Sequence, residues 1–274
     1  MILYSLYYYD KPLLAPWLSH YCQLKAITEI IIQNQNWSSE NTNYLLETVA
    51  EYIDEHKKKI VILPSTYKPI KGEGKRGQFL HYGQSQIRNR VMQFLKGDVF
   101  IASAMDEIIY GENYDDTNRK LEDFENIAEE RAKWKKISVG FIPLYGVFQD
   151  GIYPQAYAHE HKRAEPGEQS NWRHRIFSFP MPFRRSLQTP KAHDATYEAL
   201  IKGEWIKKTP SSSIPFRDDY TANEDHYCFL DLKLLHYHTL IRPSFESVEC
   251  HIPRNIKNRK HHPKAFIDVL LNQR

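Results

Sequence analysis

Apolar positions in the first hundred residues gather into short runs that alternate with segments of helical periodicity. The apolar runs predict strands at residues 2–9, 27–33, 59–63 and 98–102. Between them, apolar residues recur every three or four positions, which predicts helices that begin near Lys11, near Glu40 and near Gln84. Strands that alternate with helices indicate βαβ units, so we expect an α/β fold with a mostly parallel central sheet flanked by helices.

The pattern changes in the second part of the chain. Residues 117–134 predict one charged amphipathic helix, whereas residues 150–190 mix histidine, arginine, proline and aromatic side chains with little periodicity. Such a mixture is typical of a binding surface. We therefore expect one domain with two halves, a regular half at 1–110 and an irregular half at 111–274 that ends in a basic tail at 254–264.

Composition excludes several classes of protein. Lys and Arg number 37 against 34 Asp and Glu, and a net charge of +3 argues against a dedicated electrostatic DNA-binding protein. The three cysteines form no Cys-x-x-Cys pair, which excludes a zinc finger and a thioredoxin-type site. No apolar run reaches the roughly 18 residues that span a bilayer, and no signal-peptide pattern is present. We expect a cytoplasmic protein without a membrane span.

Two adjacent carboxylates, Asp106 and Glu107, follow the predicted strand at 98–102. Ligands of open parallel sheets bind outside the carboxyl ends of the strands, where carboxylates can hold a divalent cation and a diphosphate. The alternative is that both residues only cap a turn. The sequence leaves these two interpretations open.

A second candidate is the pair His236 and His238, which flank Tyr237. On a strand, alternate residues face the same side, so both imidazoles could point at one metal ion. A histidine pair taken alone is more often structural. Imidazole is also a borderline ligand for Mn²⁺.

Five further residues are candidates for binding a nucleotide cofactor. Tyr8 and Asp10 follow the first predicted strand, and Asn34 follows the second. Arg88 and Asn89 lie on the helix before the carboxylates, where a guanidinium can pair with a phosphate. The alternative for Arg88 is an exposed, solvated side chain.

The second half offers candidates for a general base, since it contains Asp150, Glu160 and Glu168. The alternative for most of them is a solvated polar loop. Basic segments occur at 57–59, 71–76, 133–136 and 254–264. Such segments, interleaved with aromatic residues, can follow a phosphate backbone, although charge runs are usually ordinary solvated faces.

In chain order, these segments resemble the GT-A glycosyltransferases, a Rossmann-like class that uses nucleotide-sugar donors. Residues 103–107, Ser-Ala-Met-Asp-Glu, are similar to the "DxDE" turn after the fourth strand of that family. Residues 235–242, Leu-His-Tyr-His-Thr-Leu-Ile-Arg, are similar to its C-terminal His-Tyr segment. The chain departs from the family at Ala104, which replaces the first Asp, and at Gln33 or Gln35, where an Asp usually touches the nucleoside.

The resemblance implies a Rossmann-like GT-A fold in which residues 1–110 bind the nucleotide sugar and residues 111–274 bind the acceptor. It implies transfer of a sugar from a nucleotide-diphosphate donor, a UDP-sugar in the first instance, to an acceptor hydroxyl. It also implies Mn²⁺ or Mg²⁺ on Asp106, with His236 or His238. Two acceptors stay open, a hydroxylated base in DNA and a saccharide. The replaced Asp supports an alternative, a catalytically decayed transferase fold that acts as a nucleic-acid- or sugar-binding module.

Overall fold

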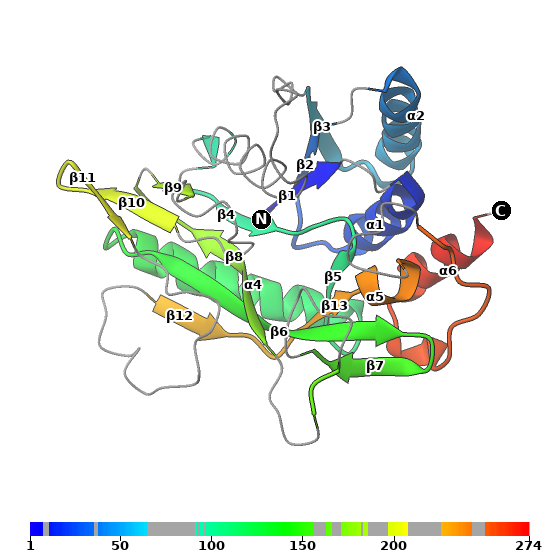
Figure 1. Cartoon of the computed structure of the whole chain (residues 1–274). Coiled ribbons are helices and arrows are strands. Elements are labelled where there is room, and N and C mark those ends of the chain that lie inside the picture. The colour runs from blue at the N-terminus through cyan, green and yellow to red at the C-terminus, as the bar shows by residue number, and fades with distance from the viewer. Residues whose placement is uncertain are drawn as a thin grey trace, which may run out of the picture.

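The protein has a mixed α/β fold (Figure 1). The computed structural model describes residues 1–7, 11–35, 38–64, 91, 94–95, 97–155, 163–165, 171–181, 183–185, 197–207, 226–242 and 250–273.

The first half of the chain forms one side of the main sheet. Its elements are β1 (Ile2–Tyr7), α1 (Lys11–Gln23), β2 (Glu29–Asn34), α2 (Ser39–His56), β3 (Lys59–Leu63) and β4 (Val99–Ala102). The four strands are parallel and lie in the order β3-β2-β1-β4. Because connections between parallel strands cross over the sheet, α1 and α2 pack on its face and bury their apolar stripes there.

The second half completes the same sheet. Its strands there are β6 (Ser138–Phe148), β7 (Gly151–Pro154), β8 (Trp172–Ser178), β12 (His226–Phe229) and β13 (Lys233–His236). The sheet continues from β4 through β8, β6 and β13 to β5 (Glu107–Tyr110) at the far edge. Strand β8 is antiparallel to both β4 and β6, and β5 is antiparallel to β13. The sheet is therefore mixed on this side, not parallel throughout.

Strand β6 joins two parts of the sheet. Residues 138–143 of β6 pair with β8, and residues 144–148 pair with β7 or β13. The register shifts between Gly140 and Phe141, and such a bulge bends a strand and increases its twist. The long strand thus carries the chain from one part of a curled sheet to the other.

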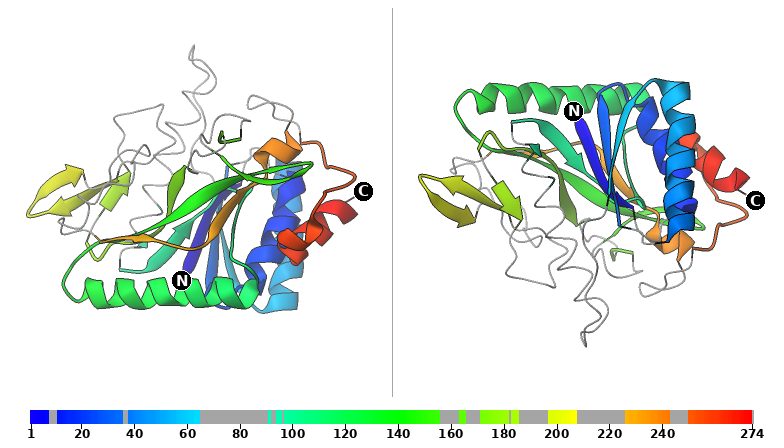
Figure 2. Two further views of the ribbon diagram at one scale, coloured as in Figure 1. Left: turned by 90° about the horizontal axis from the view of Figure 1, so that it is seen from below. Right: turned by 90° about the horizontal axis from the view of Figure 1, so that it is seen from above.

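The remaining elements surround this sheet. They are α4 (Tyr114–Ala132), α5 (His238–Ile241), η2 (Arg259–His261), α6 (Lys264–Asn272) and a separate small sheet of β9 (Phe183–Arg185), β10 (Tyr197–Ile201) and β11 (Glu204–Lys207). Figure 2 shows α4 extended along the sheet and α6 beside α1 and α2 at one end. Side chains of α1, α4 and α6 share one large buried cluster with the strands.

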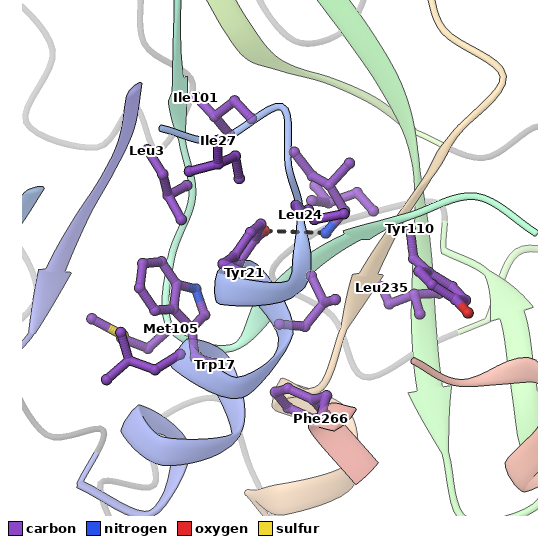
Figure 3. Packing of buried hydrophobic residues seen from close by; sticks show 14 of the residues in the cluster. Leu3, Trp17, Tyr21, Leu24, Ile27, Ile101, Met105, Tyr110, Leu235 and Phe266 are labelled. Atoms are coloured by element: carbon purple, nitrogen blue, oxygen red, sulfur yellow. Dashed lines mark hydrogen bonds between the residues drawn. The ribbon is translucent and has the colours of Figure 1, made fainter. Parts of the chain in front are cut away.

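Figure 3 shows how α1 enters this cluster. Trp17 and Tyr21 are fully buried one helical turn apart, with their ring centroids 4.8 Å apart. The Trp17 indole donates a hydrogen bond to the Ala104 carbonyl at 3.1 Å, and the Tyr21 hydroxyl accepts one from the Ile109 amide at 3.1 Å. Helix α1 therefore fixes both ends of the connection between β4 and β5.

Several expectations change. The predicted strand at 59–63 is confirmed, whereas the one at 27–33 begins two residues later and ends at Asn34. The second half is not irregular where it is described, because it supplies five strands of the main sheet, and the basic tail is followed by α6. No described helix is both long and apolar enough to cross a membrane.

Candidate metal centre

The connection between β4 and β5 carries the first candidate ligand, Asp106. The backbone of this connection is held on two sides. The Trp17 indole of α1 donates to the Ala104 carbonyl, and the Tyr237 amide donates to the Asp106 carbonyl at 2.8 Å. Asp106 is 9% exposed. Because the turn is fixed from both halves of the chain, the carboxylate has a defined position and does not merely cap a turn.

The two histidines lie where β13 gives way to α5. His236 is the last residue of β13, Tyr237 is in the turn, and His238 begins the helix. The expectation that both lie on one strand is therefore wrong. The Leu240 amide donates to the Tyr237 carbonyl, which starts the helix and turns His238 back toward His236. The two rings stack with their centroids 5.5 Å apart.

The structure brings the three predicted ligands together. Asp106 Oδ2 lies 3.0 Å from His238 Nδ1 and 3.8 Å from His236 Nε2, and one ligand atom of each residue lies within 4.8 Å of the others. Asp106 and His238 are 132 positions apart in the sequence. All three side chains are buried.

These separations fit a metal ion. Ligand atoms that each lie about 2.1 Å from a shared ion are roughly 3.0 Å apart at a right angle and at most about 4.2 Å apart on opposite sides of it. Two of the three separations, 3.0 and 3.8 Å from Asp106 Oδ2, fall inside this range, and the third is no more than 4.8 Å. One carboxylate and two imidazoles are a ligand set that divalent transition metals accept.

The protonation states also suit a cation. Burial would raise the pKa of Asp106, but the His238 hydrogen bond and the charges of His236 and Arg242 outweigh it and hold the pKa well below its usual range. Burial lowers the pKa of His236 to about 4, against the opposing effect of Asp106. At neutral pH the site therefore offers an ionised carboxylate and a neutral imidazole, the forms that bind metals.

Gln155 orients one of the imidazoles. Its Oε1 lies 3.2 Å from His236 Nδ1, and Gln155 is fully buried. An amide oxygen only accepts hydrogen bonds, so Nδ1 carries the proton and the Nε2 lone pair is directed at Asp106. Histidines that ligate metals commonly donate their other ring N–H to such a partner.

Glu107 has a different role from Asp106. Arg175 of β8 donates to both of its carboxylate oxygens, with Nε 2.8 Å from Oε2, and the Ala104 amide donates to Oε2 at 3.2 Å. Burial would raise the pKa of Glu107, but the Arg175 charge outweighs it and lowers the pKa. Glu107 thus locks the turn that carries Asp106.

Guanidinium groups surround the ligands. Arg242 lies 3.6 Å from Asp106 and 3.1 Å from His238, and Arg173 is 3% exposed and near enough to His236 to affect its pKa. With Arg175, three guanidinium groups lie around the two carboxylates in the described part of the site. This environment favours an anionic ligand.

Two other predicted residues lie elsewhere. Asn34 is the last residue of β2, at the carboxyl edge of the sheet, and its amide donates to Thr42 of α2 at 3.0 Å. Asp150 lies in the turn between β6 and β7, where its pairing with Arg163 lowers its pKa. The structure does not bring Asp150 into contact with Asp106.

The remaining candidates fall outside the described residues. They are Tyr8, Asp10, Arg88, Asn89, Glu160 and Glu168.

Gln33 and Gln35 flank Asn34 at the carboxyl edge of the sheet. The Gln33 amide donates to the carbonyls of Leu63 and Pro64, so it ties the end of β3 to β2. Gln35 is 7% exposed, and its Nε2 has no hydrogen-bond partner among the described residues. A buried amide donor at a ligand-binding edge fits a contact with a bound molecule.

Sequence reasoning missed the residues that support the ligands. Gln155, Arg173 and Arg175 lie in the segment 150–190, whose composition is typical of a binding surface, but their individual roles carry no local signal because their partners come from distant strands. Arg242 had a signal, since it ends the segment that resembles the family's His-Tyr motif.

Comparison with known proteins adds no relative. No protein-family model matches this chain, and no curated protein matches it in sequence.

Proposed function

We propose that this protein is a GT-A type glycosyltransferase that transfers a sugar from a nucleotide-diphosphate donor, with a divalent cation held by Asp106, His236 and His238. One observation carries the proposal. The turn that resembles "DxDE" and the segment that resembles the His-Tyr motif are far apart in the sequence, and their side chains meet at 3.0 Å. If the two segments resembled the family only by chance, there would be no reason to expect them in contact.

The topology supports the same function. The order β3-β2-β1-β4 is that of the first half of nucleotide-binding α/β sheets, and Asp106 follows the fourth strand at their carboxyl edge. The buried amide of Gln35 lies at this edge too, where the family places a residue that contacts the nucleoside.

Charge separates this proposal from other uses of the same ligands. A carboxylate with two histidines also fits non-haem iron oxygenases and some zinc enzymes. The surrounding Arg173, Arg175 and Arg242 favour a ligand with several negative charges, and a nucleoside diphosphate is one.

The residues of the site would have the following roles. Arg242 contributes positive charge beside Asp106, where a leaving diphosphate gains negative charge. Glu107 and Arg175 keep the turn in place. A bound divalent cation would supply Lewis-acid stabilisation of the leaving group. The general base remains a candidate among Asp150, Glu160 and Glu168.

The ligand set also bears on which cation binds. Two of the three ligand atoms are imidazole nitrogens, which suit transition metals better than Mg²⁺. Imidazole nitrogen from His236 and His238 thus compensates for the Asp that Ala104 replaces. Of the two cations expected from the sequence, we propose Mn²⁺ over Mg²⁺.

Isothermal titration calorimetry with UDP, GDP and CDP, with and without Mn²⁺, tests the proposal. We expect one nucleotide to bind in a Mn²⁺-dependent manner and Asp106→Asn to abolish that dependence. The matched control is Asp123→Asn, which changes an exposed carboxylate on α4 that pairs with Arg119. Hydrolysis and transfer assays on the corresponding UDP-, GDP- or CDP-sugar follow.

Two outcomes would contradict the proposal. Mn²⁺ affinity that is unchanged in Asp106→Asn would refute the metal centre. Mn²⁺ binding without any nucleotide binding would favour the alternative, a decayed transferase fold that acts as a binding module, for which the replacement of the first Asp by Ala104 is the supporting observation.

A further inference from the structure

The segment from Arg254 to Lys264, here called the basic band, combines an ordered backbone with a high density of positive charge. Its five Lys and Arg side chains are all exposed: Arg254, Lys257, Arg259, Lys260 and Lys264. No acidic residue occurs between Cys250 and Asp268. The exposed side chains from His251 to Lys264 are cations, histidines and asparagines, with no large apolar residue among them.

The basic band is anchored to the domain and is not a loose tail. Ile256 is 2% exposed and belongs to the main buried cluster. The Lys257 amide donates to the Gln149 carbonyl in the turn between β6 and β7. His262 is buried and its Nδ1 lies 2.9 Å from the Tyr237 hydroxyl. The exposed cations therefore project from a fixed backbone, which reduces the conformational entropy lost on binding.

The basic band also differs from the other charged surfaces. Several exposed cations elsewhere have an acidic neighbour, as in the pairs Lys11–Glu40, Arg119–Asp116 and Lys133–Glu130. None of the five cations of the basic band forms an ion pair with a described residue. Like charges gathered without counter-charges repel one another, and an anionic partner would relieve this repulsion.

The basic band lies close to the candidate metal centre. Tyr237, which bonds to His262, stands between the two histidine ligands. Figure 1 shows the segment between residue 250 and α6 passing the end of β6 and β7, where the Lys257 amide donates to the Gln149 carbonyl. A long anion that lies on the basic band thus passes the end of the molecule at which Asp106 and the histidines meet.

We propose that the basic band docks the phosphate backbone of a nucleic acid, which is the acceptor class of the enzyme. That the nucleic acid is an acceptor rests on the proposed transferase function, whereas the docking does not. A repeating phosphodiester matches several cations on one ordered segment. A membrane surface fits less well, because peripheral membrane segments bury apolar side chains and the basic band exposes none.

Fluorescence anisotropy with a labelled 20-base-pair DNA duplex and its single strand, measured over a range of salt concentrations, tests the proposal. We compare the wild type with Arg254→Gln/Arg259→Gln/Lys260→Gln. Each phosphate contact contributes about 0.9 to the slope of log K against log salt for duplex DNA, so this variant should lose about 2.7 of that slope.

The matched control is Lys133→Gln/Lys135→Gln/Lys136→Gln, which removes three exposed lysines just beyond the C-terminal end of α4. We expect its slope to equal that of the wild type. Circular dichroism and thermal melting check that both variants fold. An equal loss in both variants would overturn the assignment to the basic band, since it would indicate attraction to charge in general.

Two more results would overturn the proposal. One is the absence of binding to both the duplex and the single strand at low salt. The other is binding to vesicles that contain phosphatidylserine without binding to nucleic acid, which would indicate a membrane surface. Anisotropy is recorded with and without Mn²⁺. Nucleic-acid binding that does not depend on Mn²⁺ would separate failure of the metal centre from failure of the docking.

Discussion

The two halves of the chain build their parts of the sheet in different ways. In the first half, β1, β2 and β3 are neighbours in chain order, and α1 and α2, which connect them, pack on the sheet. In the second half, β8 is inserted between β4 and β6, and β13 between β6 and β5. The first half is thus largely determined by local pattern, and the second by contacts across long distances in sequence.

The candidate metal centre lies where these halves meet. Residues 103–106 connect β4 to β5, and these strands stand at separated positions in the sheet order. A connection of four residues spans at most about 17 Å, so the sheet has to curl to bring the two strand ends together. The curl places Asp106 from the first half against His236 and His238 from the second. Neither half contains the site alone.

The Glu107–Arg175 pair provides the strongest test of how the halves are joined. Glu107→Gln leaves a largely buried guanidinium without its counter-charge, which should lower the free energy of unfolding by about 3 kcal/mol. Urea denaturation measures the loss. The control Glu130→Gln breaks an exposed pair and should cost below about 0.5 kcal/mol.

Adding Arg175→Met sharpens this test. The double variant should lose less stability than Glu107→Gln alone, because no unpaired charge stays buried. If the double variant loses as much free energy of unfolding as the two single variants together, the two side chains contribute to stability independently of each other.

A smaller effect is expected from His20 of α1. Its Nε2 lies 3.0 Å from the Ile109 carbonyl, and burial lowers its pKa to about 3. The unfolded chain binds a proton near pH 6.5 and the folded chain does not, so stability falls as the pH drops from about 6.5 toward 3. At pH 5 the loss from this group is about 2 kcal/mol.

Urea denaturation of the wild type and of His20→Gln at pH 7 and pH 5 checks this expectation. Between pH 7 and pH 5, the free energy of unfolding should fall by about 2 kcal/mol less in the variant than in the wild type. The same sensitivity in both proteins would mean that His20 does not contribute to the acid lability of the fold.

The smallest effect concerns Gln155, which acts within the second half. Gln155→Leu removes the acceptor that orients His236, and we expect Mn²⁺ affinity to fall about tenfold. Gln149→Leu, an exposed change in the turn between β6 and β7, serves as the control. Calorimetric titration with Mn²⁺ gives both affinities, and equal values would show that Gln155 has no part in holding the ligand.

The sequence by itself determined the α/β class, the strand at 59–63 and three residues that the structure brings together, Asp106, His236 and His238. Apolar periodicity and the position of polar residues after a strand are local properties of the sequence, and they do not depend on contacts between distant segments. The prediction that His238 lies on a strand with His236 was wrong. A continuous strand and a strand followed by a short helix can both bring these two imidazoles near one point, so the local pattern does not distinguish them.

Only the tertiary structure decided which residues support the ligands and which charges stay uncompensated. Gln155 and Arg175 reach the site through strand pairings between distant segments, and no local pattern encodes such pairings. The basic band seemed one charge run among several in the sequence. In the structure Lys59 pairs with Glu29 and Lys133 with Glu130, whereas no cation of the basic band forms an ion pair with a described residue, because counter-charges are assigned by position in space and not by order along the chain.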